Sequence, residues 1–343
     1  MKNPSVAIIV LNYNNEEDTI DCIKSLKFVS YNNFKIFLVD NGSEKESVDR
    51  LKQGLEQVNV SEFKNFELLD IYPNVGFSGG NNVGIRKALK ENFDYILLLN
   101  NDTTVEPNFL DEIVKVAESD KKIGVVGPKI YFHPNMIEDD EDIVDCTNEE
   151  VINHPSDLIK EKNKKKKPLL IWYGGGDFSW FGGGKHLRYE EIEKNPNETK
   201  IEKSKYVTGC AFLIKKGVID KVGVMPEDFF LYYEDTDWSL SVREAGFSLV
   251  YAPASKIYHK VSRTTKKLGN PTIHYYHIRN ALLLSKRHAP KIILAGIYVW
   301  SALYYLKQVL KLIIMPKKRE SSKMIMRGIE DFYKNKFGQY EEK

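Results

Sequence analysis

The chain has 343 residues, 42% of them hydrophobic and 29% charged, a composition typical of a folded globular protein and not of a disordered one. Lysine and arginine total 50 against 48 acidic residues, so the formal charge of +2 indicates no basic face for binding nucleic acid. The length allows one large domain with an appendage, or two modest domains.

The chain begins with an apolar run at residues 6–11 that is too short for the hydrophobic region of a secretory signal peptide. It predicts a buried strand, and we expect the N-terminal body to be cytoplasmic. The cysteines Cys22, Cys146 and Cys210 lie far apart without C-x-x-C spacing. This spacing argues against a zinc ribbon or a disulfide framework and fits a reducing compartment.

The first third of the chain alternates apolar runs with helical patterns. The apolar runs predict strands at residues 6–11, 35–39, 66–71, 95–99 and 123–126. The patterns between them predict helices at residues 16–28, 44–55, 79–91 and 107–119. Strands that are apolar throughout and joined by helices predict an α/β fold, with a mostly parallel sheet covered by helices on both faces.

The predicted strands end in polar segments. The first four are followed by Asn12-Tyr13-Asn14-Asn15, Asp40-Asn41-Gly42-Ser43, a glycine- and asparagine-rich stretch at 74–82, and Asn100-Asn101-Asp102-Thr103. Ligands of parallel α/β sheets bind at the carboxyl ends of the strands. The sequence therefore predicts a polar binding crevice at this edge of the sheet.

The regular pattern stops at residues 137–168, where acids cluster at 138–142 and lysines at 164–167. We expect a flexible surface insertion within a domain at residues 1–288, the alternative being a charged binding loop. Order resumes with an apolar run at 169–173, two glycine triplets at 174–176 and 182–184, and a predicted strand at 206–214.

Two groups of acids stand out. Asp102 follows the strand at 95–99, although it could also cap a turn before Pro107. Glu234, Asp235 and Asp237 form a group of three carboxylates beside an aromatic run, and their mutual repulsion should raise a pKa. The alternative is helix capping by Asp235 or its neighbour, and capping is compatible with catalysis.

Five motifs occur in the order seen in family 2 glycosyltransferases. They are Asn12-Tyr13-Asn14, Val39-Asp40-Asn41-Gly42-Ser43, Asn74-Val75-Gly76-Phe77, Leu99-Asn100-Asn101-Asp102 and Tyr233-Glu234-Asp235-Thr236-Asp237. The chain resembles the rhamnosyltransferase-like branch of that family over roughly residues 5–285. The resemblance implies the GT-A fold, UDP- or dTDP-sugar donors, and inversion of the anomeric centre.

The resemblance also implies a nucleotide-sugar site. Tyr13 and Asp40 would contact the nucleobase, and Asn74 and Gly79 would lie along the ribose and diphosphate. The set of nucleotide-sugar-binding residues that we expect is Asn12, Tyr13, Asn14, Asp40, Asn74, Gly79, Asn100, Asp102 and Arg279.

The same resemblance implies catalytic and metal-binding roles. Asp102 matches the last acid of the family's D-x-D metal motif, and Asp235 matches the catalytic base. His259 matches a histidine that joins the metal in some relatives, although a lone histidine after a strand could also be structural. The implied cofactor is a divalent metal, Mg²⁺ or Mn²⁺.

The chain departs from the family pattern in two places. Asn100 occupies the first D-x-D position, where a neutral oxygen donor weakens the expected metal affinity. His277-Ile278-Arg279-Asn280 stands in place of the Q-x-x-R-W motif of processive synthases, which speaks against processive synthesis. Arg279 could reach the diphosphate or form a structural ion pair.

We therefore expect an inverting, metal-dependent hexosyltransferase that moves a rhamnose-like or other hexose to a hydroxyl of a saccharide or lipid-linked acceptor in cell-surface polysaccharide synthesis. The G-x-G-x-x-G and P-loop motifs of dinucleotide and nucleoside-triphosphate enzymes do not occur. The alternative is a membrane-attached nucleotide-sugar-binding protein without turnover, which product formation would distinguish.

Residues 289–343 predict a helical tail. The apolar segment 292–315 is interrupted by Lys307, Gln308 and Lys311. Its uninterrupted part, 292–306, would be about 22 Å long as a helix, against about 30 Å for a hydrocarbon core. With Trp300 and Tyr304 near these lysines and basic residues at both ends, it predicts a helix lying on the inner face of the cell membrane. A spanning helix and a buried or dimer-forming helix are the alternatives.

Overall fold

The computed structural model of the chain describes residues 3–60, 63, 65–134, 168–261 and 270–341. The insertion expected at 137–168 lies outside these residues except for residue 168, as does Cys146. The other two cysteines, Cys22 and Cys210, are free and buried, as expected.

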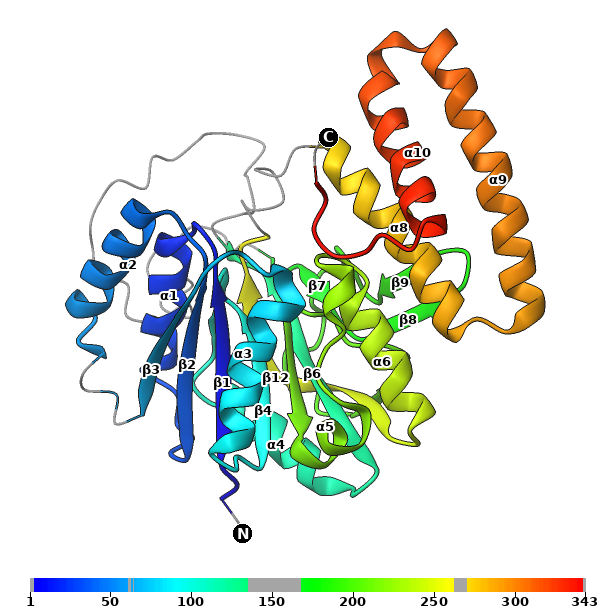
Figure 1. Cartoon of the computed structure of the whole chain (residues 1–343). Helices are drawn as coiled ribbons and strands as arrows, with labels where there is room; N and C mark the ends of the chain where they lie inside the picture. Colours follow the sequence, from blue (N-terminus) through cyan, green and yellow to red (C-terminus); the bar gives the residue numbers. More distant parts are fainter. Residues whose placement is uncertain (1–2, 61–62, 64, 135–167, 262–269, 342–343) are drawn as a thin grey trace.

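A ten-stranded, mostly parallel sheet forms the centre of the molecule (Figure 1). Its main strand order is β10-β12-β6-β11-β4-β1-β2-β3, with β5 paired to β12 and β7 paired to β6. The strands are β1 Val6–Asn12, β2 Phe34–Asn41, β3 Phe66–Ile71, β4 Tyr95–Asn100, β5 Thr103–Val105, β6 Ile123–Phe132, β7 Ile171–Tyr173, β10 Glu202–Ser204, β11 Ala211–Lys215 and β12 Ser248–His259. Neighbouring strands β1 to β4 run parallel, and β11 is antiparallel to both β4 and β6.

Helices cover both faces of the sheet, as predicted from the apolar strands. Successive residues of β1, such as Ile8 and Ile9, point to opposite faces and join different cores. One core packs under α1 Glu16–Leu26, α2 Lys45–Gln57 and α4 Phe109–Ser119. The other packs under α3 Gly76–Lys90, α5 Lys216–Val222 and α6 Glu234–Glu244.

The predicted elements of the first third all occur, with end points shifted by a few residues. The largest difference is β6, which continues to Phe132 instead of ending at 126. Its polar member Lys129 is buried because its ammonium pairs with Glu193 at 2.5 Å. The predicted strand at 206–214 is shorter in the structure, because residues 206–209 approach the polar edge of the sheet before β11 begins.

A third core joins the loop before α6 to the C-terminal helices. It contains Phe229 and residues of α8 Asn270–His288, α9 Lys291–Ile314 and α10 Arg319–Tyr333, which follows the short helix η4 Pro316–Lys318. Gly328 of α10 allows a close crossing over α8, since a Cβ there would lie 2.7 Å from the carbonyl oxygen of Tyr275. Residues on both sides of the domain boundary expected at residue 288 thus share this core.

A small two-stranded sheet, β8 Gly176–Ser179 with β9 Gly183–His186, lies beside these helices (Figure 1). Its strands contain three of the six glycines in the two triplets noted in the sequence. Gly183 is the first residue of β9 after the turn and has a φ of +67°, a conformation that glycine adopts without strain.

Candidate active site

The carboxyl ends of β1, β2 and β4 open into one cavity of about 330 Å³. Its lining residues are Leu11, Tyr13, Asn41, Asn74, Gly76, Phe77, Asn100, Asn101, Asp102, Trp172, Thr208, Gly209, Cys210, Phe230, Leu231, Tyr232, Glu234, Asp235 and His259. The polar segments that follow separate strands thus meet at one edge of the sheet, as predicted for a parallel α/β fold.

Six of the predicted site residues line this cavity. They are Tyr13, Asn74, Asn100, Asp102, Asp235 and His259. They come from the ends of β1, β4 and β12, from the loop before α3 and from the first turn of α6. The structure therefore brings together side chains that are far apart along the chain.

Asn12, Asn14 and Asp40 form a layer behind the cavity wall. Asp40 is buried and accepts hydrogen bonds from the Asn12 amide at 2.6 Å and from the Ser43 hydroxyl at 2.8 Å. The Ser43 hydroxyl also accepts the backbone N–H of Asn14 at 2.9 Å. These contacts fix the tips of β1 and β2 relative to one another.

Gly79 lies one turn inside α3 and is not among the cavity-lining residues. Gly76 lines the cavity instead. Its φ is +79°, and a Cβ at this position would lie 2.5 Å from the carbonyl oxygen of Phe230. The absence of a side chain at Gly76 lets the loop that precedes α6 pack directly against the start of α3.

Asp102 and His259 form a buried pair at the bottom of the cavity. The Nε2 atom of His259 lies 3.2 Å from Oδ1 of Asp102, and both side chains are about 95% buried. Burial by itself lowers the pKa of His259, but the Asp102 carboxylate and Cys210 more than offset this effect, so that the pKa lies well above its usual value. The pairing of β5 with β12 sets this geometry, because it aligns Thr103 with His259.

The Asp102–His259 pair suits a metal ion whose remaining coordination positions are filled by the substrate. Two ligand atoms about 2.1 Å from one octahedral ion lie about 3 Å apart, close to the separation of Oδ1 and Nε2. Among the described residues there is no group of three or more His, Cys, Asp or Glu side chains placed to hold a metal. Mg²⁺ is usually bound by one or two protein carboxylates together with substrate phosphates, so a two-ligand site is compatible with this chemistry.

Asp235 and Glu234 line another part of the cavity. Asp235 accepts hydrogen bonds from the backbone N–H groups of Gly209 at 2.8 Å and Thr236 at 2.6 Å. Burial outweighs these bonds and raises the pKa of Asp235. Burial, followed by the neighbouring Asp235 charge, raises the pKa of Glu234 to about 8.

Helix capping does not account for Asp235. The N-cap of α6 is Tyr233, in the left-handed conformation, and Asp235 lies in the first turn. The third acid of the motif, Asp237, has a structural role, because it pairs with Arg287 at 3.2 Å and with His288 at 3.1 Å. The three carboxylates of the motif therefore differ in their surroundings.

The loop before α6 has an unusual backbone. Phe230, Tyr232 and Tyr233 all have positive φ values, between +63° and +73°. Bulky residues in this region cost on the order of 1–3 kcal/mol each, so surrounding contacts must hold the loop in place. Asn280 of α8 provides three of them, because its amide nitrogen lies within 3.0 Å of the carbonyl oxygens of Phe229, Leu231 and Tyr232.

The expectation that Arg279 binds the diphosphate is not supported by its position. Arg279 is fully buried outside the cavity, and its guanidinium donates to the carbonyl oxygens of Phe229 at 2.9 Å and Gly338 at 2.7 Å. Since these bonds occupy the planar fork, we assign Arg279 to the support of the loop. The alternative, a structural ion pair, is not found among its described hydrogen-bond partners, which are carbonyls, an amide and a tyrosine hydroxyl.

Sequence reasoning missed several lining residues. Trp172 and the segment Thr208–Cys210 come from parts of the chain without a motif that we could interpret. Trp172 packs edge-on against His259, with 4.4 Å between ring centroids. Residues 208–210 fell inside the strand predicted at 206–214, whereas β11 begins only at Ala211, so the sequence pattern did not show that they line the cavity.

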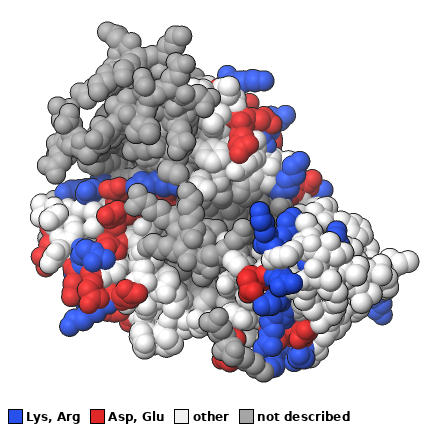
Figure 2. Space-filling model, turned by 90° about the horizontal axis from the view of Figure 1, so that it is seen from above, with Lys and Arg blue, Asp and Glu red and all other residues white. Residues whose placement is uncertain are grey.

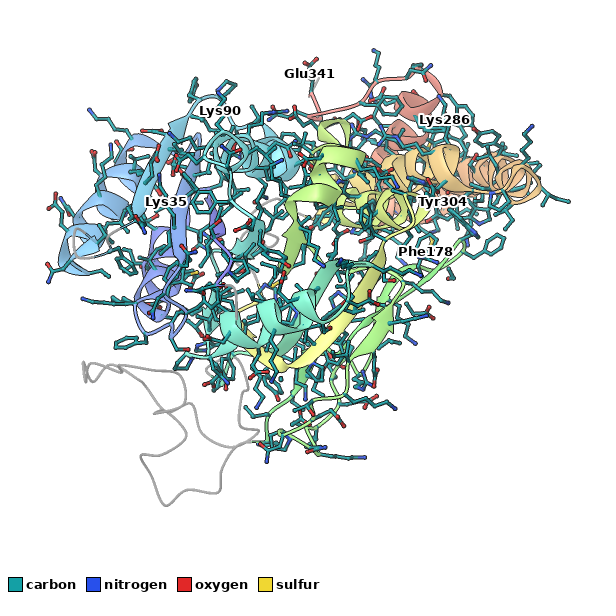
Figure 3. All side chains as sticks on the ribbon, turned by 90° about the horizontal axis from the view of Figure 1, so that it is seen from below. Lys35, Lys90, Phe178, Lys286, Tyr304 and Glu341 are labelled. Carbon is teal, nitrogen blue, oxygen red and sulfur yellow. The ribbon has the colours of Figure 1, made fainter. Side chains whose placement is uncertain are left out.

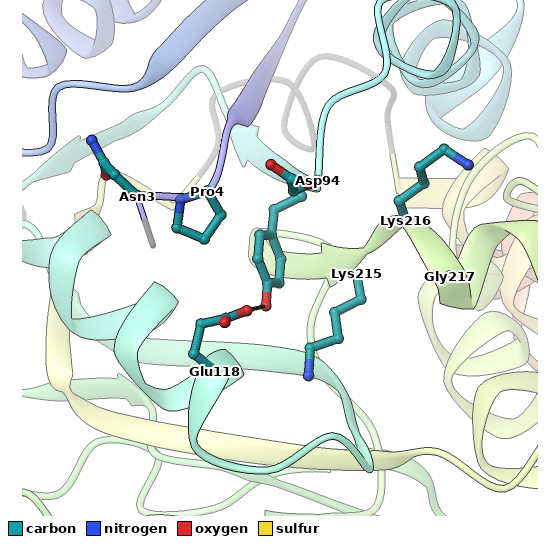
Figure 4. Close-up of a pocket in the computed structure, with 8 residues that line it drawn as sticks. Asn3, Pro4, Asp94, Glu118, Lys215, Lys216 and Gly217 are labelled. Carbon is teal, nitrogen blue, oxygen red and sulfur yellow. Dashed lines mark hydrogen bonds between the residues drawn. The ribbon is translucent and has the colours of Figure 1, made fainter. Parts of the chain in front are cut away.

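A second cavity lies at the other end of the central strands, near the start of β1 and β4 (Figure 4). It measures about 520 Å³ and is lined by residues including Asp94, Glu118 and Lys215. The Tyr95 hydroxyl donates to Glu118 here. Although this cavity is larger, it lies where the parallel strands begin, away from the strand tips that bind ligands in such sheets.

The sequence model of the family described as Glycosyl transferase family 2 matches residues 7–223 of the chain. A dTDP-rhamnosyl transferase RfbF of Shigella flexneri is 21% identical over 316 residues, which cover 88% of this chain and 87% of the relative. An N-acetylglucosaminyl-diphospho-decaprenol L-rhamnosyltransferase of Mycobacterium tuberculosis is 23% identical, with 78% of this chain and 80% of the relative covered.

Solved structures show the same fold at low sequence identity. The structure of GalNAc-T7 with UDP, GalNAc and Mn²⁺ has a TM-score of 0.62 at 14% identity and covers 96% of this chain, which spans 56% of that protein. The mannosyltransferase PcManGT of Pyrobaculum calidifontis, solved with GDP-Man and Mn²⁺, has a TM-score of 0.52 at 11% identity, with 98% of this chain and 88% of that one covered.

Proposed function

The chain belongs to glycosyl transferase family 2, in its rhamnosyltransferase-like branch, and is a glycosyltransferase of GT-A fold; from this membership we propose that it transfers a rhamnose-like or other hexose from a UDP- or dTDP-sugar to an acceptor hydroxyl with inversion. The observation that carries the proposal is the single cavity at the strand tips, which contains both a carboxylate suited to general-base catalysis and a carboxylate–histidine pair suited to a divalent metal.

Asp235 is the proposed base. It accepts the proton of the acceptor hydroxyl while that oxygen forms a bond to the anomeric carbon. The bond from the anomeric carbon to the diphosphate oxygen breaks, and the nucleoside diphosphate leaves with both electrons. Because the hydroxyl attacks from the side opposite the leaving group, a single displacement inverts the centre.

Asp102 and His259 are the proposed protein ligands of Mg²⁺ or Mn²⁺. The metal, when bound, neutralises charge that develops on the departing diphosphate. Asn100 lines the same cavity and offers a neutral amide oxygen close to the tip of β4. The bound forms of GalNAc-T7 and PcManGT, each with Mn²⁺, support divalent metal use in proteins of this fold.

The nucleotide of the donor is proposed to lie against Tyr13 and Asn74, which line the cavity on the β1 and β2 side. Asn12, Asn14 and Asp40 support this part of the site through their shared contacts with Ser43. Gly79 lies inside α3 behind Gly76 and outside the cavity lining, so the proposal gives it no contact with the donor.

The proposed acceptor is a saccharide or lipid-linked glycan intermediate, used at the cytoplasmic face of the cell membrane. In the described part of the chain, α9 is the one helix long and apolar enough to cross a membrane by length and composition. At 24 residues it would be about 36 Å long, longer than the sequence pattern suggested.

Attachment to the membrane surface suits α9 better than crossing does. Its inner side is tied to the charged helix α10, since Tyr305 donates to Glu330 at 2.9 Å and Ser301 lies 2.7 Å from the hydroxyl of Tyr333. A spanning α9 would carry the charged side chains of α10 into hydrocarbon, where each would cost several kcal/mol. We therefore retain the surface position that the sequence predicts.

The outer side of α9 has the composition of a membrane-contacting surface. Val299, Leu303, Leu306, Leu310 and Ile313 recur every three or four residues and are 58–73% exposed. Between residues 291 and 319 the chain contains lysines and one arginine but no acid. Figure 2 shows uncharged atoms spread over the C-terminal helices, with Lys and Arg side chains beside them. An apolar stripe flanked by cations is what an anionic membrane surface attracts.

The test is transfer from a panel of UDP- and dTDP-hexoses, with the product identified by mass spectrometry. Donors are first chosen by thermal shift with and without Mn²⁺, because a ligand that binds the folded state raises its stability. We expect one donor to shift the melting temperature and to give a product of inverted configuration. Stabilisation by a donor without any transfer would favour the alternative, a nucleotide-sugar-binding protein without turnover.

A further inference from the structure

A second hollow adjoins the active site and is not explained by the donor or the metal. This hollow, which we call the apolar groove, has a volume of about 430 Å³ and lies between the β8–β9 hairpin and the helices α8 and α9. Phe178 and Trp180 line it from the hairpin, and Trp300 and Tyr304 line it from α9. Figure 3 shows Phe178 and Tyr304 on neighbouring elements at the same side of the molecule.

The apolar groove and the catalytic cavity share an aromatic wall. Tyr232 lines the catalytic cavity and Tyr233 lines the groove. Both rings contact His277: Tyr232 stacks on it with 4.5 Å between centroids, and Tyr233 meets it edge-on at 5.9 Å. Since Glu234 and Asp235 follow directly in the chain, a molecule in the groove lies one aromatic layer away from the proposed base.

The groove also adjoins the exposed side of α9. Trp300 lines the groove and is still 46% exposed, and its ring stacks on Tyr304 with 4.8 Å between centroids. Its neighbours Val299 and Leu303 belong to the outward apolar stripe of the same helix. A continuous apolar path therefore leads from the proposed membrane-contacting surface through the groove to the edge of the catalytic cavity.

The lining chemistry distinguishes a hydrocarbon from a sugar. Among the described residues that line the groove none is Asp, Glu, Asn, Gln, Lys or Arg, and its polar side-chain atoms belong to two serines, two histidines, two tyrosines and two tryptophans. A buried saccharide needs several side-chain hydrogen-bond donors and acceptors, such as carboxylates and amides, to replace its contacts with water, because unpaired polar groups are costly to bury. A hydrocarbon chain needs only apolar walls, and this volume falls within the range of about 300–1,000 Å³ found for small-molecule sites.

We propose that the apolar groove binds the carbon chain of a lipid-linked acceptor next to its head group, and so directs the acceptor's sugar toward Asp235. The proposal rests on the proposed function, and it adds that the acceptor carries a polyprenyl-like chain and enters along α9. The groove acts on acceptor binding, whereas the donor and metal are bound at the other side of the aromatic wall.

The first test measures binding alone, with farnesyl phosphate as the probe and methyl phosphate as the same head group without a chain. Trp180 and Trp300 line the groove, so tryptophan fluorescence of the full chain reports occupancy. Ala281→Phe introduces a ring from α8 into the groove, and Phe181→Glu places a charge at a lining residue that is 83% exposed, where we expect little effect on the core. The matched control is Ala302→Phe, on the exposed side of α9 and outside the groove lining.

We expect farnesyl phosphate to bind the wild type, and methyl phosphate to bind at least about tenfold more weakly. Ala281→Phe and Phe181→Glu should each weaken farnesyl phosphate binding about tenfold or more and leave UDP binding unchanged, and Ala302→Phe should change neither. Equal binding of farnesyl phosphate by all three variants would overturn the proposal, as would displacement of the probe by N-acetylglucosamine, which would indicate a saccharide site.

A second measurement separates this proposal from the proposed function. Transfer to a polyprenyl-diphosphate-linked sugar is compared with transfer to the same sugar on a methyl group. In Ala281→Phe, the KM for the long-chain acceptor should rise about tenfold, whereas kcat and the KM for the donor stay the same. Normal transfer to both acceptors in this variant contradicts the groove alone, and the absence of transfer to either acceptor by the wild type contradicts the proposed function.

Discussion

The Asp235 carboxylate accepts a hydrogen bond of 2.8 Å from the backbone N–H of Gly209, which links the first turn of α6 to the segment before β11 across the cavity. This bond fixes the orientation of the proposed base, while burial raises its pKa and so strengthens it as a proton acceptor.

Replacing Asp235 with asparagine keeps the shape of the side chain and removes the basic oxygen. We expect Asp235→Asn to reduce the transfer rate by about 10²–10⁴-fold, with donor binding unchanged. The matched control is Asp237→Asn, which alters the acid paired with Arg287 and His288. This control should lower the melting temperature and retain most of the turnover, and the reverse pattern would assign the base to Asp237.

The metal proposal predicts that EDTA abolishes transfer and that Mg²⁺ or Mn²⁺ restores it. Asp102→Asn and His259→Gln should each weaken Mn²⁺ binding in the presence of UDP, measured by calorimetry, by about tenfold or more. The control is His186→Gln, because His186 packs on the same Trp172 ring as His259 but lies outside the cavity lining. Full activity in excess EDTA contradicts the roles of both Asp102 and His259.

The buried Glu234 predicts how stability depends on pH. Its pKa rises from 4.5 to about 8 in the folded protein, so the unfolded chain releases the proton first as the pH increases. The contribution of this group to stability is therefore fully present below about pH 4.5 and is lost as the pH rises through about 8.

Glutamine imitates the protonated form of this side chain. Glu234→Gln should match the wild type in urea unfolding near pH 4.5 and be more stable than the wild type above pH 8. Parallel stability curves for the two proteins across this range would show that Glu234 titrates normally in the folded state.

The contacts of Asn280 predict a role in positioning the base. Asn280→Asp keeps the size of the side chain but replaces the donor that holds the carbonyl groups of Phe229, Leu231 and Tyr232. We expect kcat to fall about 10- to 100-fold, because small displacements of catalytic groups have large effects on rate. UDP affinity should change less than threefold, and an equal loss of kcat and UDP affinity would instead indicate a general structural defect.

The apolar stripe of α9 predicts binding to vesicles that contain anionic lipid. The double variant Leu303→Glu and Leu306→Glu should remain in the supernatant in a flotation assay that recovers the wild type with the vesicles. Ile192→Glu serves as the control, since Ile192 is similarly exposed at 55% but lies outside the C-terminal helices. Recovery of the double variant with the vesicles would exclude α9 as the contact. Truncation after residue 288 is less informative, because it also removes α10 from the third core.

The sheet and the positions of its polar tips could be predicted from the sequence, because strand burial and helix patterns are local properties. The family resemblance placed Asp102 and His259 at one metal, but their direct contact depends on the alignment of β5 with β12, which no local pattern indicates. Lys129 shows a further limit: its charge interrupts the apolar run of β6, and only its distant partner Glu193 makes its burial possible. Arg279 shows the same limit at the site, because backbone carbonyls that satisfy a guanidinium leave no trace in the sequence.

The contact between residue 338 and the loop before α6 has a consequence for the order in which the protein is made. Gly338 donates to the carbonyl oxygen of Asp228 at 2.8 Å and accepts from Arg279 at 2.7 Å. The ribosome synthesises residue 338 after every strand of the sheet, so a nascent chain can form the strand tips before the loop gains these last backbone contacts. We therefore expect a chain that ends before residue 338 to bind donor but to transfer sugar more slowly than the full chain.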